Sequence, residues 1–240
     1  MIYTENVTLG IEDIGRDMAI TNTGILRVFE NIATHQSDAA GYGVADIEGK
    51  GVAWLLLDWK ITVCKRAYYG ETLRVDTWPR FLERFYSYRD FELYNEAGEL
   101  CVIGTSKWVL YNAKAGKITR ITEAVKNSYA MDSKNVYGIE KIEKQEPPAG
   151  YDSVYYYKPM RRDIDMNNHV HNLFYLDIAI EALPEEIFLQ GDFNNLQISY
   201  KKEIKRGDEI RCEYSREGDV HTVVIRGESG NELHAVIRMF

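Results

Sequence analysis

The chain contains an internal duplication, and this feature constrains its fold more than any single motif does. The segment WKITVCKRAYYGETLRVDT of the first half aligns with QISYKKEIKRGDEIRCEYS of the second half. Further along, the run Gly98–Leu100 is echoed by Gly230–Leu233. A spacing of about 137 residues is too long for a solenoid repeat and fits two copies of one small domain. The duplication therefore predicts two similar domains in tandem.

Each half shows the same predicted order of elements. In the first half, a strand over residues 4–14 precedes a helix capped near Thr21, and strand-like periodicity fills the chain from Val52 to Asn112. In the second half, a strand over residues 153–158 precedes a helix. The strands expected after it are Leu196–Tyr200, Glu209–Tyr214, His221–Gly227 and Leu233–Met239.

The segment between the halves, MDSKNVYGIEKIEKQEPPAG, has alternating charges, no apolar stripe and a proline pair. Such a segment is typical of a connector. We therefore expect an α+β fold with one domain over residues 1–130, a linker over residues 131–150 and a second domain over residues 151–240. In each domain, an antiparallel sheet is expected to wrap around its own helix.

Composition excludes several classes of protein. The net charge of −8 argues against a general nucleic-acid binder, which needs a basic footprint. The three cysteines are odd in number and far apart, which suits a reducing compartment without disulfides or structural zinc. The first residues show no signal or transit-peptide character, and the longest apolar run, Val52–Leu57, is too short to span a bilayer. We expect a soluble, cytoplasmic protein.

Polar groups concentrate in the stretch RRDIDMNNHVHNLFYLDIAIEALP, residues 161–184. Apolar residues follow at helical spacing, which predicts a helix that ends at Pro184; they are Leu173, Leu176, Ile180 and Leu183. We predict that Asn167 or Asn168 caps this helix, with His169 on its core face and His171 turned away. A carboxylate, an amide and an imidazole would then meet at a helix N-terminus, where free N–H groups favour negative charge.

Each of these residues has a plainer interpretation when taken alone. Asn167 could be only a cap, His169 a satisfied core residue and Asp165 a turn residue. The combination is harder to explain in that way, because three polar groups leading into a buried stripe destabilise the fold unless they have partners. Asp163 is interpreted as structural, as a residue that caps the loop.

The run RRDIDMNNHVHN resembles the D-x-D-x-N-x-H-V-N-N run of the acyl-ACP thioesterase family, of the bacterial type. The resemblance covers nearly the whole chain and implies a tandem hotdog fold. The family's catalytic Asp, Asn and His fall on Asp165, Asn167 and His169, and its downstream catalytic Glu falls on Glu203. In the first copy, three tryptophans also resemble family positions, and one of them, Trp54, is assigned to substrate binding; the three are Trp54, Trp78 and Trp108.

The chain departs from the family pattern at two positions. His171 stands where the family has an Asn, which matters little if that side chain faces outward. Ile204 follows Glu203, where many relatives have a Cys that older schemes treat as a nucleophile. Because an Ile side chain cannot attack a thioester, a thiol mechanism is not expected here.

The resemblance implies hydrolysis of the thioester that joins a fatty acyl chain to acyl carrier protein. No cofactor is expected, and no metal, because His169 and His171 cannot face one ion from one helix turn and no other His is nearby in sequence. Backbone amides around Asn168 and His169 would stabilise the oxyanion, and one such donor is typically worth ~3 kcal/mol. Asp165 would either attack directly or act as a base toward water, and Asn167 and His169 would orient it. Glu203 would position or deprotonate the hydrolytic water.

Acyl carrier protein is the expected partner, and it is acidic, as this chain is. Docking therefore requires a local basic patch. The candidates lie close in sequence to the catalytic groups: Arg161, Arg162, Lys201, Lys202, Lys205 and Arg206. We assign Asn168 and four of these, Arg161, Arg162, Lys201 and Lys202, to substrate binding. A homodimer stays open, and neither nucleic-acid binding nor membrane insertion is expected.

The first copy lacks the polar set, so its apolar interior is predicted to hold the acyl chain. Three alternatives stay open. An acyl-CoA thioesterase would accept the same acyl group on a smaller carrier. A hotdog hydratase would act on enoyl thioesters. A non-catalytic acyl-binding module is the third, although it has no use for buried titratable groups.

Overall fold

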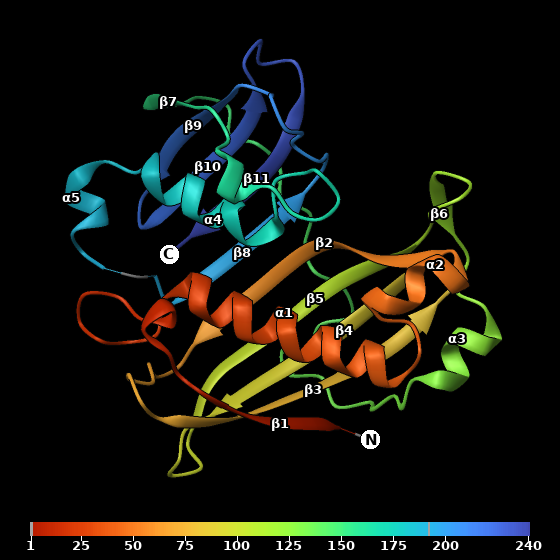
Figure 1. Ribbon diagram of the computed structural model, residues 1–240. Helices are drawn as coiled ribbons and strands as arrows, with labels where there is room; N and C mark the ends of the chain where they lie inside the picture. The colour runs from red at the N-terminus through yellow and green to blue at the C-terminus, as the bar shows by residue number, and fades with distance from the viewer. Residues whose placement is uncertain (1, 192) are drawn as a thin grey trace. The chain divides into compact units, whose positions relative to one another are not determined.

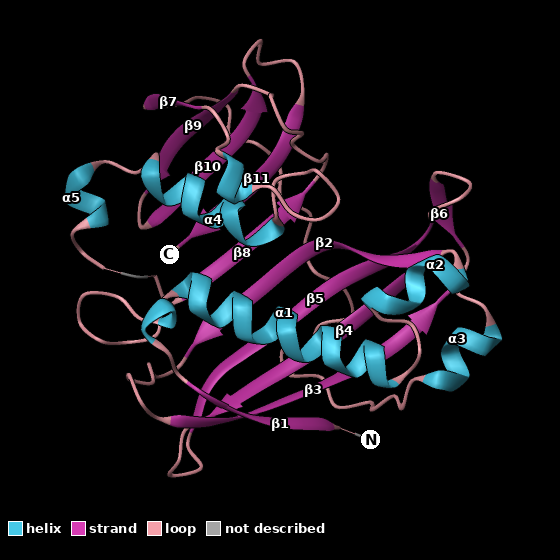
Figure 2. Ribbon diagram, in the orientation of Figure 1, coloured by secondary structure: helices cyan, strands magenta, loops and turns pink. Residues whose placement is uncertain are grey.

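The structure is a computed structural model that describes residues 2–191 and 193–240. The chain divides into two compact units, Met1–Ile142 and Glu143–Phe240. Each unit contains antiparallel strands and one main helix, as Figures 1 and 2 show. None of the helices in the described part of the chain is long and apolar enough to cross a bilayer.

The first unit is a five-stranded antiparallel sheet in the order β1-β3-β4-β5-β2, with the short β6 paired to β5. Its strands are β1 (Tyr3–Thr8), β2 (Val52–Val63), β3 (Thr72–Glu83), β4 (Tyr86–Tyr94), β5 (Leu100–Asn112) and β6 (Lys117–Thr119). Its helices are α1 (Asn22–Ala39), α2 (Ile47–Lys50) and α3 (Glu123–Ser128), with 3-10 turns η1 (Ile11–Asp13) and η2 (Val44–Asp46). The predicted strands between Val52 and Asn112 are confirmed.

The strand predicted over residues 4–14 is only partly right, because β1 ends at Thr8 and η1 follows. The reason is local: the carboxylate of Asp13 accepts a hydrogen bond from the Gly10 N–H at 2.8 Å, which closes a turn. The predicted cap of the first helix is confirmed, since the Thr21 hydroxyl accepts from Gly24 N–H at 3.0 Å.

The core of the first unit forms where α1 packs on the sheet. Phe29 of α1 stacks on Phe91 of β4, with ring centroids 4.7 Å apart, and Phe29 is fully buried. A glycine, Gly104 of β5, permits this approach, because a Cβ there would lie 2.7 Å from the Phe29 ring. This packing fixes α1 across the face of the sheet.

The segment expected to be a connector, residues 131–150, contains neither helix nor strand. Its first part is nevertheless held on the first unit. Trp78 Nε1 donates to the Lys134 carbonyl at 2.8 Å, and Arg80 donates to the Ile139 carbonyl at 2.7 Å. These contacts explain why the first compact unit extends to Ile142.

The second unit repeats the strand order of the first as β7-β9-β10-β11-β8. Its strands are β7 (Ser153–Tyr157), β8 (Asn195–Tyr200), β9 (Ile210–Glu217), β10 (Val220–Gly227) and β11 (Leu233–Met239). Its helices are α4 (Asn172–Glu181) and α5 (Glu185–Phe188), with the 3-10 turn η3 (Arg161–Asp163). The helix α4 has 10 residues and α1 has 18, so one constant spacing cannot align both copies throughout.

Candidate active site

A tight loop of residues 163–170, here called the polar loop, precedes α4 in the second unit. Ile164 pairs with Val170 across its base, and Asp165 N–H donates to the His169 carbonyl at 2.8 Å. Asn168 N–H donates to the Asp165 carbonyl at 3.0 Å, and Asn168 has a φ of 64°. That left-handed conformation is one that Asn adopts more readily than most residues.

The polar loop corrects the predicted start of the helix. The helix α4 begins at Asn172, so neither Asn167 nor Asn168 caps it and His169 is not on its face. His171 is the N-cap instead, and its Nδ1 accepts from Leu173 N–H at 3.4 Å. The helix pattern failed here because hydrogen bonds between side chains and backbone within the loop compete with a helical turn.

The C-terminal end and the buried face of the helix also differ from the prediction. The helix α4 ends at Glu181, and Pro184 precedes the separate α5. Of the four residues predicted to line the core, only Leu176 is buried; Leu173, Ile180 and Leu183 are half-buried. The buried face is formed by Tyr175, Leu176, Ile178 and Ala179.

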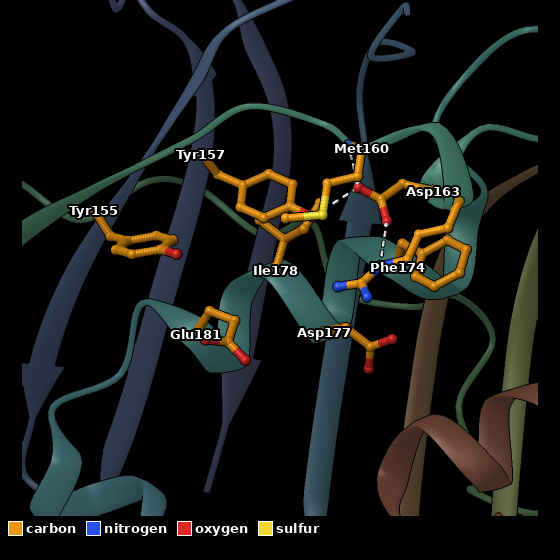
Figure 3. Close-up of a pocket in the computed structure, with 9 residues that line it drawn as sticks. Tyr155, Tyr157, Met160, Asp163, Phe174, Asp177, Ile178 and Glu181 are labelled. Atoms are coloured by element: carbon orange, nitrogen blue, oxygen red, sulfur yellow. Dashed lines mark hydrogen bonds and ion pairs between the residues drawn. The ribbon is translucent and has the colours of Figure 1, made fainter. Parts of the chain in front are cut away.

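Asp163 has the structural role that the sequence predicted. It is 2% exposed, and its carboxylate accepts from the Tyr157 hydroxyl and the Met160 N–H, both at 2.7 Å. Figure 3 shows this carboxylate turned toward Tyr157 and Met160. Its backbone carbonyl accepts from His171 N–H at 2.8 Å, so Asp163 ties η3 to the start of α4.

The carboxylate of Asp165 is held by its own loop. It accepts from the N–H groups of Asn167 at 2.8 Å and His169 at 3.2 Å, and from the side-chain amide of Asn167 at 3.2 Å. The expectation that amides of Asn168 and His169 wait at a helix N-terminus for an oxyanion is therefore wrong. Those two N–H groups already donate to the Asp165 carbonyl and carboxylate, respectively.

The structure brings Glu203 to the polar loop, although the two are far apart in sequence. Val170 N–H donates to the Ile204 carbonyl at 2.8 Å, and His169 pairs with Lys205 as neighbouring strands do. Glu203 directly precedes Ile204. Its side chain is 46% exposed, and its Oε1 lies 3.8 Å from Lys205 Nζ. The loop and the Glu203 segment thus form one surface of the second unit.

A residue that the sequence analysis missed, Tyr175 of α4, lies beneath this surface. It is 2% exposed. Burial raises the pKa of Tyr175 well above its usual range, and the negative charges of Glu203 and Asp165 add to this effect. In the sequence, the one sign of this residue was a tyrosine within an apolar stretch predicted to be helical.

The first unit contains a counterpart of the polar loop, which sequence alignment alone had not found. Ile14 pairs with Ile20, and Ala19 pairs with Tyr68, as Ile164 pairs with Val170 and His169 with Lys205. Gly15 and Ala19 occupy the places of Asp165 and His169. The prediction that the first copy lacks the polar set compared Asn167 and His169 with residues 21–35. The matching segment instead precedes α1, where Asp17 and Ala19 stand in their places.

A hollow of about 510 Å³ opens elsewhere in the second unit, between β7, η3 and α4 (Figure 3). Tyr155 and Tyr157 of β7 and Phe174 and Ile178 of α4 contribute to its walls. Neither Asp165 nor Glu203 lines it.

Comparison with known proteins bears on the whole chain. The acyl-ACP thioesterase N-terminal domain family matches residues 1–129, and the acyl-ACP thioesterase C-terminal domain family matches residues 148–240. The chain belongs to the acyl-ACP thioesterase family. The resemblance stated from the polar motif is therefore confirmed, and with it the expected fold class of tandem hotdog domains.

Curated relatives of this family member include two chloroplastic oleoyl-acyl carrier protein thioesterases of Arabidopsis thaliana. They are 24% and 26% identical over 87% and 86% of this chain. The chain spans 62% and 60% of their lengths.

Solved structures of similar fold include an acyl-ACP thioesterase from Bacteroides thetaiotaomicron. Its TM-score is 0.87 at 20% sequence identity, and the match covers 100% of this chain and 97% of the Bacteroides chain. The 12:0-ACP thioesterase from Umbellularia californica gives a TM-score of 0.84 at 18% identity, with coverage of 99% and 96%.

None of the three cysteines of this family member belongs to the polar loop, residues 163–170. Cys101 and Cys212 are buried, and Cys64 is exposed. Burial raises the pKa of the Cys212 thiol to about 12, so this group is not a thiolate near neutral pH. Within the described ranges, no three His, Cys, Asp or Glu side chains gather as ligands for a metal ion.

The residues assigned to substrate binding fall into two places. Arg161, Arg162, Lys201 and Lys202 are all exposed on the second unit. Trp54 lies in the first unit, where its indole N–H donates to the Tyr129 hydroxyl at 2.8 Å and its ring meets that of Tyr129 edge-on. Trp54 is thus at least part of an apolar cluster with Tyr129, and its contact with substrate stays a prediction.

Proposed function

We propose that this chain hydrolyses the thioester between a fatty acyl group and the phosphopantetheine arm of acyl carrier protein, releasing free fatty acid and holo-ACP. One observation carries the proposal most: in a chain matched by the family over both domains, Glu203 lies beside the loop of Asp165, Asn167 and His169. The names of the Arabidopsis relatives support acyl carrier protein as the carrier.

We assign the activation of water to Glu203. Its carboxylate is half-exposed, whereas that of Asp165 already accepts three hydrogen bonds from its own loop. Glu203 would take a proton from water, and the water oxygen would add to the thioester carbonyl carbon. Collapse of the tetrahedral intermediate breaks the C–S bond, and the departing sulfur takes the proton back from Glu203.

Asp165 would then orient the polar loop through the three hydrogen bonds that its carboxylate accepts. The Asn167 side-chain amide has a second N–H besides the one that it donates to Asp165, and we assign this N–H and the half-buried imidazole of His169 as donors to the oxyanion. The alternative role of Asp165, direct attack on the carbonyl, predicts a covalent acyl-enzyme.

Mass spectrometry of the Glu203→Gln variant separates these two routes. If Asp165 attacks and Glu203 only activates the second water, the variant accumulates an acyl group on Asp165 after mixing with acyl-ACP. An unmodified protein with lost turnover supports general-base catalysis by Glu203. An adduct on Asp165 would overturn it.

Parallel assays of thiol release from acyl-ACP and acyl-CoA of equal chain length test the substrate. A higher kcat/KM with acyl-ACP supports the proposal, and equal values would reassign the chain to acyl-CoA. No release from either thioester would end the proposal.

The exposed basic residues supply a test of carrier docking. The double variant Arg161→Glu with Lys201→Glu should raise KM for acyl-ACP about tenfold, because it reverses two charges facing an acidic partner. The same variant should leave KM for acyl-CoA closer to that of the parent. Equal changes with both substrates would remove the patch from carrier recognition.

A further inference from the structure

Glu203 needs a support that its own segment does not provide. It lies between β8 and β9, in residues that belong to neither helix nor strand, and its exposed carboxylate lies 3.8 Å from Lys205 Nζ. A carboxylate that must hold a water in place is effective only when its backbone is fixed.

Tyr175 contacts the backbone on both sides of Glu203. Its hydroxyl accepts from the Ile204 N–H at 2.9 Å and lies 3.5 Å from the Lys202 carbonyl, to which it is oriented as a donor. Tyr175 itself is 2% exposed, and its ring packs edge-on against Tyr200 at 5.3 Å. One buried hydroxyl thus brackets the two peptide groups that flank Glu203.

His234 of β11 reaches the same carbonyl from the sheet. It is 1% exposed, and its Nδ1 lies 3.2 Å from the Lys202 carbonyl oxygen. Since a carbonyl only accepts, Nδ1 carries the proton in this contact. The carbonyl of His234 also accepts from Lys201 N–H at 2.8 Å, so β11 holds the segment at two successive residues.

The first unit lacks both supports at the equivalent positions. Ile25 of α1 stands in the place of Tyr175, and Cys101 of β5 stands in the place of His234. The Cys101 carbonyl accepts from Cys64 N–H at 2.8 Å, just as the His234 carbonyl accepts from Lys201 N–H. Arg66 stands in the place of Glu203 and anchors itself, through a 2.7 Å bond to the Ile20 carbonyl. A buried hydroxyl and imidazole therefore accompany the glutamate and are absent from the copy without it.

We propose that Tyr175 and His234 are positioning residues that hold the backbone around Glu203, so that its carboxylate presents one geometry to the hydrolytic water. This inference rests on the proposed function, because it assigns to Glu203 the activation of water. Neither side chain is proposed to touch the substrate.

Tyr175→Phe tests the hydroxyl alone. The variant should lower kcat on acyl-ACP between about tenfold and hundredfold, with KM within about twofold, because misplacing a catalytic group affects the chemical step. Tyr214→Phe is the matched control: it removes another hydroxyl of the same unit, bonded to His221 at 2.8 Å, and should leave kcat unchanged. Equal kcat values in the two variants would overturn the role of Tyr175.

His234 is tested by a pair of substitutions. His234→Leu removes the donor and should lower kcat about tenfold or more. His234→Asn places an amide N–H near the position of Nδ1 and should recover most of that loss. Failure of Asn to perform better than Leu would remove His234 from the proposal.

Combination with Glu203→Gln distinguishes positioning from general stability. If Tyr175 acts through Glu203, Tyr175→Phe should cause no further loss of kcat in a Glu203→Gln background. Additive losses would contradict the inference, since they would show that the hydroxyl acts independently of Glu203.

Hydrogen exchange gives a readout that does not depend on activity. The Ile204 amide should exchange at least about tenfold faster in Tyr175→Phe than in Tyr214→Phe, because its acceptor is lost. If Glu203→Gln retains full turnover, the proposed function of Glu203 fails. If Glu203→Gln is inactive while Ile204 exchange and kcat are unchanged in Tyr175→Phe, only the positioning inference fails.

Discussion

The loops that precede the main helices of the two units share a backbone and differ in chemistry. Both begin with a buried Asp that accepts from a backbone N–H three residues earlier, Asp13 from Gly10 at 2.8 Å and Asp163 from Met160 at 2.7 Å. Both turn through a left-handed residue, Met18 with a φ of 63° and Asn168 with a φ of 64°. The path of the chain therefore does not depend on the side chains proposed to be catalytic.

The difference lies in which residue holds the loop. In the first unit, the carboxylate of Asp17 accepts from Ala19 N–H at 3.1 Å. In the second unit, Asp165 accepts from the equivalent His169 N–H at 3.2 Å. A carboxylate at either position can close the turn, so the placement of Asp165 is explained better by chemistry than by folding.

The largest effect is expected from a variant that copies the first loop into the second. Asp165→Gly combined with Asn167→Asp reproduces Gly15 and Asp17, and should keep the fold while lowering turnover by at least about 10³-fold. Thermal unfolding and kcat on acyl-ACP measure the two outcomes. The single change Asp165→Ala should also lower turnover by orders of magnitude. Near wild-type hydrolysis in either variant would show that the loops do not differ in function.

The next largest effect on turnover is expected from substitution of Glu203. Glu203→Ala should lower kcat by about 10²- to 10⁴-fold, the usual range for loss of a general base, without unfolding the protein. Glu209→Ala removes another exposed carboxylate of the same unit, paired with Lys158 at 2.5 Å, and serves as the control. Similar kcat values for the two variants would leave Glu203 without a catalytic role.

Some parts of this molecule could be predicted from the sequence and others could not, because only some of them leave a pattern along the chain. Strand periodicity and the duplication gave the two sheets, because alternation of buried and exposed residues is a property of the pattern alone. The start of α4 at Asn172 was missed because Asp165 bonds to nearby N–H groups in three dimensions. Tyr175 and His234 were missed as supports, because only the folded chain brings both to the Lys202 carbonyl.

The shared aspartates should give a smaller effect that concerns stability. Asp163→Ala leaves the Tyr157 hydroxyl and Met160 N–H without their acceptor, and should lower the free energy of unfolding by ~2–3 kcal/mol. Asp13→Ala should have a comparable effect, because Asp13 accepts from Gly10 and pairs with Arg27. Urea denaturation measures both. Loss of stability in only one variant would show that the two loops are not held in the same way.

The smallest effect is expected from Cys212→Ala, which should change kcat by less than about twofold. Cys212 is fully buried on β9, where the first unit has Val75 in the aligned segment, and Ile204 follows Glu203 in place of a thiol.

Burial raises the pKa of the Cys212 thiol from 9.0 to about 12, so the folded protein keeps a proton that the unfolded chain loses above pH 9. The stabilisation from this group is thus complete below pH 9 and is lost as the pH rises toward 12. Denaturation of wild type and variant across pH 8–11, beside the hydrolysis assay, checks both points, and a strong loss of activity would restore a thiol mechanism.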